Sequence, residues 1–350
     1  MKRNYSCICT TLLIAIITIA GLGLTQGCVR YPNTDVFVNV QWLKALIDSN
    51  NNGNPFVIIE AGWGGPEASY DLGHIPGAIH VNTDEIEYDI LAESSTTAAQ
   101  DSCKGLNPGD ELPRNWWNIY PDEYLLASFA CMGIDKDTTV IVYGPDISGA
   151  ARVVWALMYA GAKDVHLLEG SYETWTAAGY NGSTQTTEPT PVADFGATQA
   201  LNPLYVKSTG YVRSVVEGSH PNALIVDIRT LDEYEGKTAP YGYIPTDGRI
   251  TGAVWGRSGT TPWDMDEYMN DDGSFKSLSE IEEMWKQLGI TRDKEVIFYC
   301  GTGWRVSLTW LFAYAMGWEN ISLYDGGWYE WSMGPDADIN PVEDDYPDLP

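Results

Sequence analysis

Residues 298–307 read FYCGTGWRVS and carry the most reactive side chain of the chain, the thiol of Cys300. Gly301 and Gly303 can take positive φ, so the backbone after the cysteine can curl and aim its N–H groups at the sulfur. Arg305 can close the rim with a fixed positive charge. Such a setting stabilises the thiolate, the nucleophilic form of cysteine. The alternative is a buried core cysteine, but a core position needs neither the glycines nor the arginine.

The neighbouring segments place this cysteine where a strand ends and a helix begins. Residues 295–299 are β-branched and aromatic, which is typical of a buried parallel strand. The pattern from Val306 to Trp318 predicts a helix, whose positive N-terminal end faces the loop. We therefore expect peptide dipoles to stabilise a thiolate or a bound anion at this point.

The second half of the chain repeats the first. Val140–Tyr143 aligns without a gap on Val296–Tyr299, and Trp175 aligns on Trp331. Strand-like and helix-like segments alternate, which predicts an α/β fold of two tandem domains, each with a central parallel sheet flanked by helices. The strands expected in the first half are Phe56–Glu60, Ala78–Asn82, Thr139–Tyr143 and Val165–Leu168.

Composition changes mark the boundaries of these domains. Residues 34–180 are predicted to form the first domain and residues 204–335 the second. Residues 181–203 are polar, contain proline and lack apolar periodicity, which predicts a linker. Residues 336–350 are acidic and are expected to form a solvated tail packed loosely on the second domain.

The two copies differ in their chemistry. Gly144 stands in the first copy where Cys300 stands in the second, and Gly149 stands at the place of Arg305. The first domain therefore lacks both the nucleophile and the closing cation. We expect it to be catalytically inert and to serve as a wall, a lid or an interaction surface.

The N-terminus predicts export. An uncharged apolar run, residues 12–24, follows two basic residues and suits a signal peptide. It leads into a segment ending at Cys28 that resembles a bacterial lipobox, although leucine is more usual where Thr25 stands. Residues 1–27 are thus predicted to be a lipoprotein signal peptide and Cys28 the lipidation site. Val29 then favours the outer membrane. The alternative is a plain secretory signal cleaved nearby.

Export also bears on the other cysteines. Cys7 and Cys9 leave with the signal peptide, so Cys103, Cys131 and Cys300 remain for chemistry. An oxidising compartment permits a disulfide between the first two of these three. Cys131 nevertheless lies in a helix-like segment where a buried free cysteine is ordinary, and the free form is slightly favoured.

Charge narrows the choice of partners. The chain of 350 residues has a formal net charge of −28, which argues against nucleic acid and anionic lipid as partners. A membrane is therefore contacted only through the lipid anchor, on either its periplasmic or its surface side. Its four histidines lack metal-ligand spacing and there is no phosphate-binding or haem motif, so no metal or cofactor is expected.

Together these motifs resemble those of the two-domain rhodaneses, the thiosulfate and 3-mercaptopyruvate sulfurtransferase family. The resemblance rests on the tandem repeat, on GHIPGA at residues 73–78 and GRITGA at residues 248–253, on Asp227-Ile228-Arg229 followed by Glu233, and on the CGTGWR loop. It covers nearly all of the chain after the signal. It implies a pair of α/β domains, the first of them silent.

The resemblance also implies roles for individual residues. Cys300 is implied to carry sulfur as a persulfide, with Arg305 as its catalytic partner. The residues implied to bind substrate are Gly301, Thr302, Gly303, Trp304, Arg229 and Arg249, with Lys237 and Arg257 behind them. For Arg229 and Arg249 an ion pair with a local acid is an equal alternative to substrate contact.

The implied reaction moves sulfane sulfur from a small anionic donor to a thiol or cyanide-like acceptor. Thiosulfate is the default donor because Arg305 suits a dianion, and 3-mercaptopyruvate is the related alternative. A cysteine phosphatase is disfavoured, because those enzymes place the arginine six residues after the cysteine and Val306 stands there. The second class of function is a persulfide or chalcogen carrier, or a docking subunit with a protein partner in the cell envelope.

Overall fold

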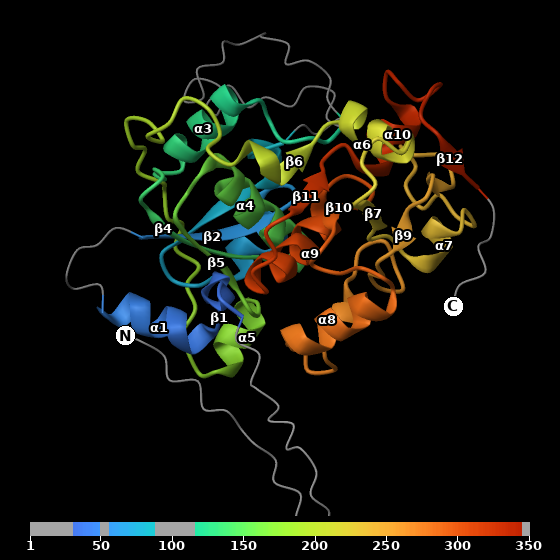
Figure 1. Ribbon diagram of the computed structural model, residues 1–350. Coiled ribbons are helices and arrows are strands. Elements are labelled where there is room, and N and C mark those ends of the chain that lie inside the picture. The colour runs from blue at the N-terminus through green and yellow to red at the C-terminus, as the bar shows by residue number, and fades with distance from the viewer. Residues whose placement is uncertain (1–30, 50–55, 88–115, 345–350) are drawn as a thin grey trace, which may run out of the picture.

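Two α/β domains lie side by side in the computed structural model, which describes residues 31–49, 56–87 and 116–344 (Figure 1). The predicted signal peptide and Cys28 lie outside the described residues, so the proposed lipid anchor stays a prediction. Along the described ranges, no helix combines the length and the apolar character needed to cross a membrane.

Five parallel strands form the sheet of the first domain, in the order β1-β5-β4-β2-β3. They are β1 (Phe37–Val38), β2 (Phe56–Gly62), β3 (Ala78–Asn82), β4 (Thr139–Tyr143) and β5 (Asp164–Leu168). The four strands expected from the sequence are confirmed to within two residues. β1 was missed because two residues are too few to show a period.

The second domain repeats this topology, with the order β6-β11-β10-β7-β9 and parallel pairing throughout. Its strands are β6 (Val206–Lys207), β7 (Ala223–Asp227), β9 (Val254–Trp255), β10 (Glu295–Tyr299) and β11 (Ile321–Tyr324). The prediction of two tandem domains with parallel sheets is therefore confirmed. Because parallel strands aim their carboxyl ends at one edge, the residues after β10 and β7 meet there.

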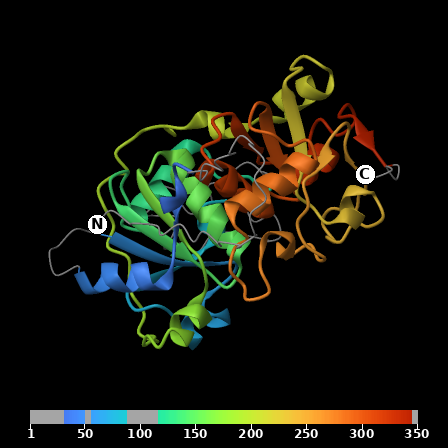
Figure 2. The same cartoon turned by 60° about the horizontal axis from the view of Figure 1, so that its bottom comes forward.

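Helices cover both sheets (Figures 1 and 2). The first domain has α1 (Val40–Ser49), α3 (Asp122–Cys131), α4 (Ile147–Ala160) and α5 (Tyr172–Ala177). The second has α6 (Thr209–Val216), α7 (Leu231–Tyr234), α8 (Leu278–Gln287), α9 (Trp304–Ala315) and α10 (Gly327–Met333). Short 3-10 turns lie at Thr34–Val36, Pro66–Ala68, Tyr70–Leu72, Thr83–Glu85, Pro203–Tyr205 and Asp266–Tyr268.

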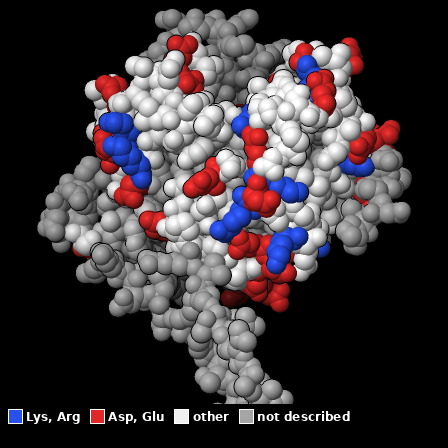
Figure 3. Space-filling view, in the orientation of Figure 1, with Lys and Arg blue, Asp and Glu red and all other residues white. Residues whose placement is uncertain are grey.

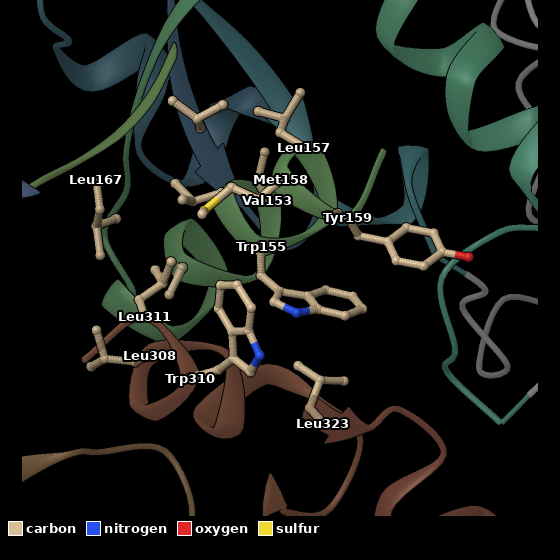
Figure 4. Close-up of a cluster of buried hydrophobic side chains, with 14 of the residues drawn as sticks. Val153, Trp155, Leu157, Met158, Tyr159, Leu167, Leu308, Trp310, Leu311 and Leu323 are labelled. Atoms are coloured by element: carbon tan, nitrogen blue, oxygen red, sulfur yellow. The ribbon is translucent and has the colours of Figure 1, made fainter. Parts of the chain in front are cut away.

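The two domains share one hydrophobic core, formed where α4 packs on α9 (Figure 4). Trp155 and Trp310 are both fully buried in it, together with Leu311. Gly149 lies at this contact, and a Cβ atom there would come within 3.1 Å of the Trp304 ring. Both helices are apolar on nearly every face, which is the pattern of a helix buried on all sides. The domains are thus joined by their cores as well as by the connecting chain.

The connecting residues 181–203 have little regular structure, but they pack along the first domain. Lys136 donates its backbone N–H to the carbonyl of Phe195, and Ser183 forms a two-way backbone bridge with His74. The imidazole of His74 is also bonded to the carbonyls of Tyr70 and Gln185. His74 therefore has a structural role, since it bonds residues 181–203 to the first domain. The linker packs on that domain and is not a free spacer.

The described part of the tail, up to residue 344, is held more firmly than expected. β12 (Val342–Glu343) pairs antiparallel with β8 (Arg249–Ile250), and Asn340 is buried. Arg213 pairs with Asp336 at 2.5 Å. The expectation of a loosely packed tail is wrong for these residues, because their backbone completes a two-stranded ladder.

Cys131 is disulfide-bonded, so the slight preference for a free thiol there is wrong. Its partner lies outside the described residues, as does Cys103. Among the residues that the structure describes, Cys300 is the free cysteine, and it is buried.

Replacing Gly149 by leucine should loosen the joint between the domains, because its side chain would clash with the Trp304 ring. We expect a loss of about 1–3 kcal/mol in the free energy of unfolding, measured by urea denaturation. Gly210→Ala is the matched control, because a Cβ atom there meets nothing within 4 Å. An equally stable Gly149→Leu variant would contradict the packing described here.

Candidate active site

Cys300 directly follows β10, and the helix after it begins earlier than expected. α9 starts at Trp304, not at Val306, because Gly303 turns the chain with φ of 96° and serves as the helix N-cap. The loop therefore spans only residues 300–303, and Arg305 lies in the first turn of the helix. Of the two glycines, only Gly303 adopts positive φ. Gly301 is required for a different reason, since the Tyr241 ring would lie 3.2 Å from its Cβ.

The carbonyl groups of this loop are held from one side by α10. Trp328 donates its N–H to the carbonyl of Cys300 (2.8 Å), and Tyr329 donates to that of Gly301 (3.1 Å). This close approach explains Gly327, where a Cβ would lie 2.5 Å from the Gly301 oxygen.

The N–H groups of the loop, unlike its carbonyl groups, are not taken up by neighbouring elements that the structure describes. In the described part of the chain, no hydrogen bond takes up the N–H groups of Gly301, Thr302 and Gly303. Thr302 is half-buried beside the cysteine, and Trp304 begins the helix. Free donors at the start of a helix are the arrangement in which anions bind, and the anion site expected from the sequence stays a prediction.

Arg305 does not close the rim as a free cation, and that expectation is wrong. It is 3% exposed and its two terminal nitrogens bond to the carboxylate of Glu233 at 2.9 and 3.1 Å. Nη2 also donates to the hydroxyl of Tyr241 (3.0 Å). Although burial raises it, the pKa of Glu233 is lowered to about 2 by the charge and hydrogen bonds of Arg305. Arg305 therefore anchors the first turn of α9 to α7.

Arg229 and Arg249 are likewise used in ion pairs, as the alternative for them allowed. Arg229 bonds to Asp227 (Nη2 to Oδ2, 2.7 Å) and to the carbonyl of Gly248. Arg249 pairs with Glu343 in β12 at 2.8 Å. Both are nearly fully buried. These pairs do not support their assignment as substrate-binding residues.

The other two basic candidates are also paired. Lys237 forms an ion pair with Glu235, and Arg257 lies 3.3 Å from Glu267. On the face drawn in Figure 3, basic side chains lie beside acidic ones. Each of the five basic candidates, Arg229, Lys237, Arg249, Arg257 and Arg305, is thus paired with a carboxylate.

Trp304 lies between the domains rather than in a substrate pocket. Its indole N–H donates to Glu87 at 2.7 Å, and its ring packs on Gly149. The first domain therefore contacts the Cys300 loop directly, and its role as a wall, a lid or an interaction surface stays a prediction.

A row of aromatic rings lines the loop, and the sequence analysis did not identify it. Tyr241 contacts Trp263 and Tyr243, whose ring contacts Trp117 and Tyr329. Burial, and to a smaller extent the charge of Cys300, raise the pKa of Tyr243. The one available signal was the Tyr-Gly-Tyr repeat at residues 241–243.

Cys300 itself is 1% exposed. Access to the sulfur therefore requires neighbouring side chains to move. A pocket of about 510 Å³ does lie at the seam between the domains, lined by residues such as Asn118, Thr209 and Asp325. Cys300 does not line this pocket, so the pocket is not assigned as the reaction site.

The model of the Rhodanese-like domain matches this chain twice, at residues 39–178 and 213–333. The chain belongs to the rhodanese-like family. A curated relative, thiosulfate sulfurtransferase YnjE of Escherichia coli, is 38% identical over 89% of this chain and 66% of its own length. The chain thus spans just under two thirds of that relative. Sulfur carrier protein TtuD of Thermus thermophilus is 26% identical over 75% of this chain and 83% of its own length.

Solved structures agree with this assignment. The anaerobic ergothioneine biosynthesis enzyme from Chlorobium limicola, in complex with trimethyl histidine, matches with a TM-score of 0.78 and 31% identity. The match covers 91% of this rhodanese and 72% of that chain. The predicted tandem rhodanese-like family is therefore confirmed, and the sulfurtransferase activity, its donor and its acceptor are treated below as proposals.

The ion pair of Arg305 and Glu233 should make the second domain sensitive to acid. A carboxyl whose pKa is lowered in the folded state contributes stability above its unfolded value, about 4.5, and loses it as the pH falls toward 2. We expect the free energy of unfolding to fall by roughly 3 kcal/mol over this window. Glu233→Gln should remove that pH dependence and cost about 3–5 kcal/mol at pH 7, because Arg305 stays buried without a counter-charge.

Glu280→Gln provides a matched control for this measurement. Glu280 holds the same place in the capping box of α8 that Glu233 holds in α7, but it is exposed and bonds only within its cap. Urea unfolding at pH 7 and pH 3 should separate the two variants. Equal effects would mean that Glu233 acts only as a helix cap.

Proposed function

We propose that this rhodanese transfers sulfane sulfur through a persulfide on Cys300. The observation that carries the proposal is a buried free cysteine at the end of β10, followed by three residues whose N–H groups lack a described acceptor. Peptide dipoles at the start of α9 favour negative charge at this point. They stabilise both the attacking thiolate and the persulfide that replaces it.

The reaction proceeds in two displacements. The Cys300 thiolate attacks the sulfane sulfur of the donor, a new S–S bond forms, and the bond inside the donor breaks. With thiosulfate the leaving group is sulfite, which departs with the bonding electron pair. A nucleophilic acceptor then attacks the outer sulfur, and the Cys300 thiolate leaves and is regenerated. Neither step needs an external oxidant or reductant.

Thiosulfate is the proposed donor. The support is that curated relatives are named thiosulfate sulfurtransferases; the charge of Arg305 gives no support, because it is paired with Glu233. The charge of thiosulfate is taken up by the loop amides of residues 301–303, in the way that backbone nests bind anions. 3-Mercaptopyruvate is the alternative donor, because its carboxylate can use the same amides.

An N-methylated histidine is a second candidate acceptor. Structures of EanB with ergothioneine or hercynine include a cysteine persulfide and variants of a threonine two residues after that cysteine. Thr302 stands at that spacing here. EanB variants also replace a tyrosine that precedes the cysteine by as many residues as Tyr241 precedes Cys300. The aromatic row beside Cys300 suits a cationic, planar acceptor through cation–π contact.

Treatment with thiosulfate should add the mass of one sulfur atom to the peptide that contains Cys300. Mass spectrometry of the purified protein measures this gain, and cyanide should remove it. Cys300→Ser should show no gain. A wild-type protein that gains no sulfur from thiosulfate or from 3-mercaptopyruvate would sink the proposal.

The same preparation separates an enzyme from a carrier. TtuD is named a sulfur carrier protein, and a carrier role is the runner-up for this chain. An enzyme releases sulfite repeatedly when thiosulfate and cyanide are both in excess, whereas a carrier stops after one equivalent. A docking role in an envelope complex would survive the Cys300→Ser change.

The aromatic row predicts which acceptor is used. The persulfidated protein should convert trimethyl histidine into ergothioneine. In this step the outer sulfur replaces hydrogen on the ring carbon, and the released proton goes to the Cys300 sulfur. Tyr241→Phe should slow this transfer about tenfold, since it removes the hydroxyl that accepts from Arg305 and donates to Pro262. Chromatography of the product provides the rate.

Tyr211→Phe is the control for this variant, because its hydroxyl bonds to Glu295 at the opposite end of β10. If the persulfide passes its sulfur to cyanide but not to trimethyl histidine, the persulfide chemistry stands and trimethyl histidine is excluded as the acceptor.

We also propose that the protein is exported and anchored in the cell envelope by a lipid on Cys28. The support is the apolar run and the lipobox-like segment of the sequence. An acidic protein held outside the cytoplasm would meet small sulfur anions directly, and a protein partner in the envelope is consistent with this location.

A further inference from the structure

Arg152 is a fully buried cation of the first domain that the reaction described above does not use. It lies in α4 and contacts three separate segments. Its Nε is 3.0 Å from Glu87 Oε2, its Nη1 is 2.6 Å from Asp325 Oδ1, and its Nη2 donates to the carbonyl of Trp117 (3.3 Å). Two carboxylates and a carbonyl from both domains therefore meet on one guanidinium.

This cluster touches the turn that ends the active loop. A Cβ atom on Gly303 would lie 2.6 Å from Arg152 Nη1 and 3.0 Å from Asp325 Oδ1, so the guanidinium packs directly against that residue. Glu87 accepts from Trp304, the next residue, with its second oxygen. The positions of Gly303 and Trp304 are thus defined by groups that Arg152 holds.

The cluster also holds Trp117, which packs on the aromatic row beside the loop, in a strained backbone conformation. Trp117 has φ of 64°, which is unfavourable for a bulky side chain and persists only where surrounding contacts impose it. Arg152 bonds to its carbonyl, and Ile119 donates its N–H to Asp325 (2.9 Å). The Trp117 ring then packs on Tyr243, 5.0 Å between centroids. The same arginine therefore sets both the loop and its aromatic wall.

We propose that Arg152 is a positioning residue of the catalytic site, through which the first domain fixes the Gly303–Trp304 turn and the Trp117 wall around Cys300. Its part in catalysis rests on the proposed persulfide chemistry. An arginine is needed because only its planar fork offers donors in three directions at once, and a lysine ammonium cannot span the same three acceptors. The first domain, silent in its own chemistry, then completes the site of the second.

The main test is Arg152→Lys, which keeps the positive charge between the carboxylates. We expect persulfide formation from thiosulfate to slow about 100-fold, as a displacement of about 1 Å in a catalytic group does, with KM for the donor changed little. Arg213→Lys is the matched control, because Arg213 also bridges two partners but holds only the tail. A wild-type rate in Arg152→Lys would overturn the proposal.

A triple variant separates positioning from charge balance. Arg152→Met with Glu87→Gln and Asp325→Asn removes the cation and both anions, while the amide oxygens can still accept from Trp304 and Ile119. If Arg152 only neutralises buried charge, this variant regains the wild-type rate. If it positions the loop, the variant unfolds at a similar urea concentration to wild type but remains slow.

Alkylation of Cys300 by iodoacetamide gives a readout that does not require sulfur transfer. We expect its rate to change in Arg152→Lys and in the triple variant, and to stay the same in Arg213→Lys. If the wild type forms no persulfide but these rates differ as stated, the proposed function fails and the positioning role stands. Unchanged alkylation and persulfide rates in both Arg152 variants would overturn the positioning role.

Discussion

Among the residues that the structure describes, none accepts from the N–H groups of Gly301, Thr302 and Gly303 between β10 and α9, and the rest of the candidate site depends on this constraint. Unpaired N–H groups in a protein interior are costly unless something else accepts from them. Here the carbonyls of Cys300 and Gly301 are bound by α10, which fixes the orientation of the loop peptides. The amides that remain would stabilise the negative charge of the proposed thiolate and persulfide.

Buried ion pairs provide the rigidity around this loop. Arg305 ties the first turn of α9 to Glu233, Arg229 ties the end of β7 to Gly248, and Arg249 is tied to the tail. In each case a charge is kept inside because a carboxylate compensates it at hydrogen-bonding distance. An arginine occupied in this way cannot also serve a dianionic substrate at full strength. Under the proposed function, the loop amides would take up the charge of an anionic substrate instead.

The two copies of the fold have divided their roles. The first has Gly144 where the second has Cys300, and the missing side chain of Gly149 lets Trp304 pack between the domains. The second keeps the nucleophile but depends on Arg152 and Trp117 from the first for the surroundings of its loop. The shared core between α4 and α9 makes this dependence possible, because it holds the two copies in a fixed relation.

Local patterns in the sequence predicted the α/β repeat, most strands of the first sheet and the place of Cys300 between a strand and a helix, because period, composition and glycine placement act over a few residues. The partners of the arginines could not be predicted, since Glu233 and Arg305 are far apart in the chain and only the parallel sheets bring β7 and β10 together. The same holds for Trp117, whose strained backbone is imposed by contacts from α4. The sequence by itself determined the tandem repeat and the place of Cys300 between a strand and a helix. The tertiary structure decided which charges are cancelled around that cysteine, because a buried charge needs a partner and the partner comes from a distant segment.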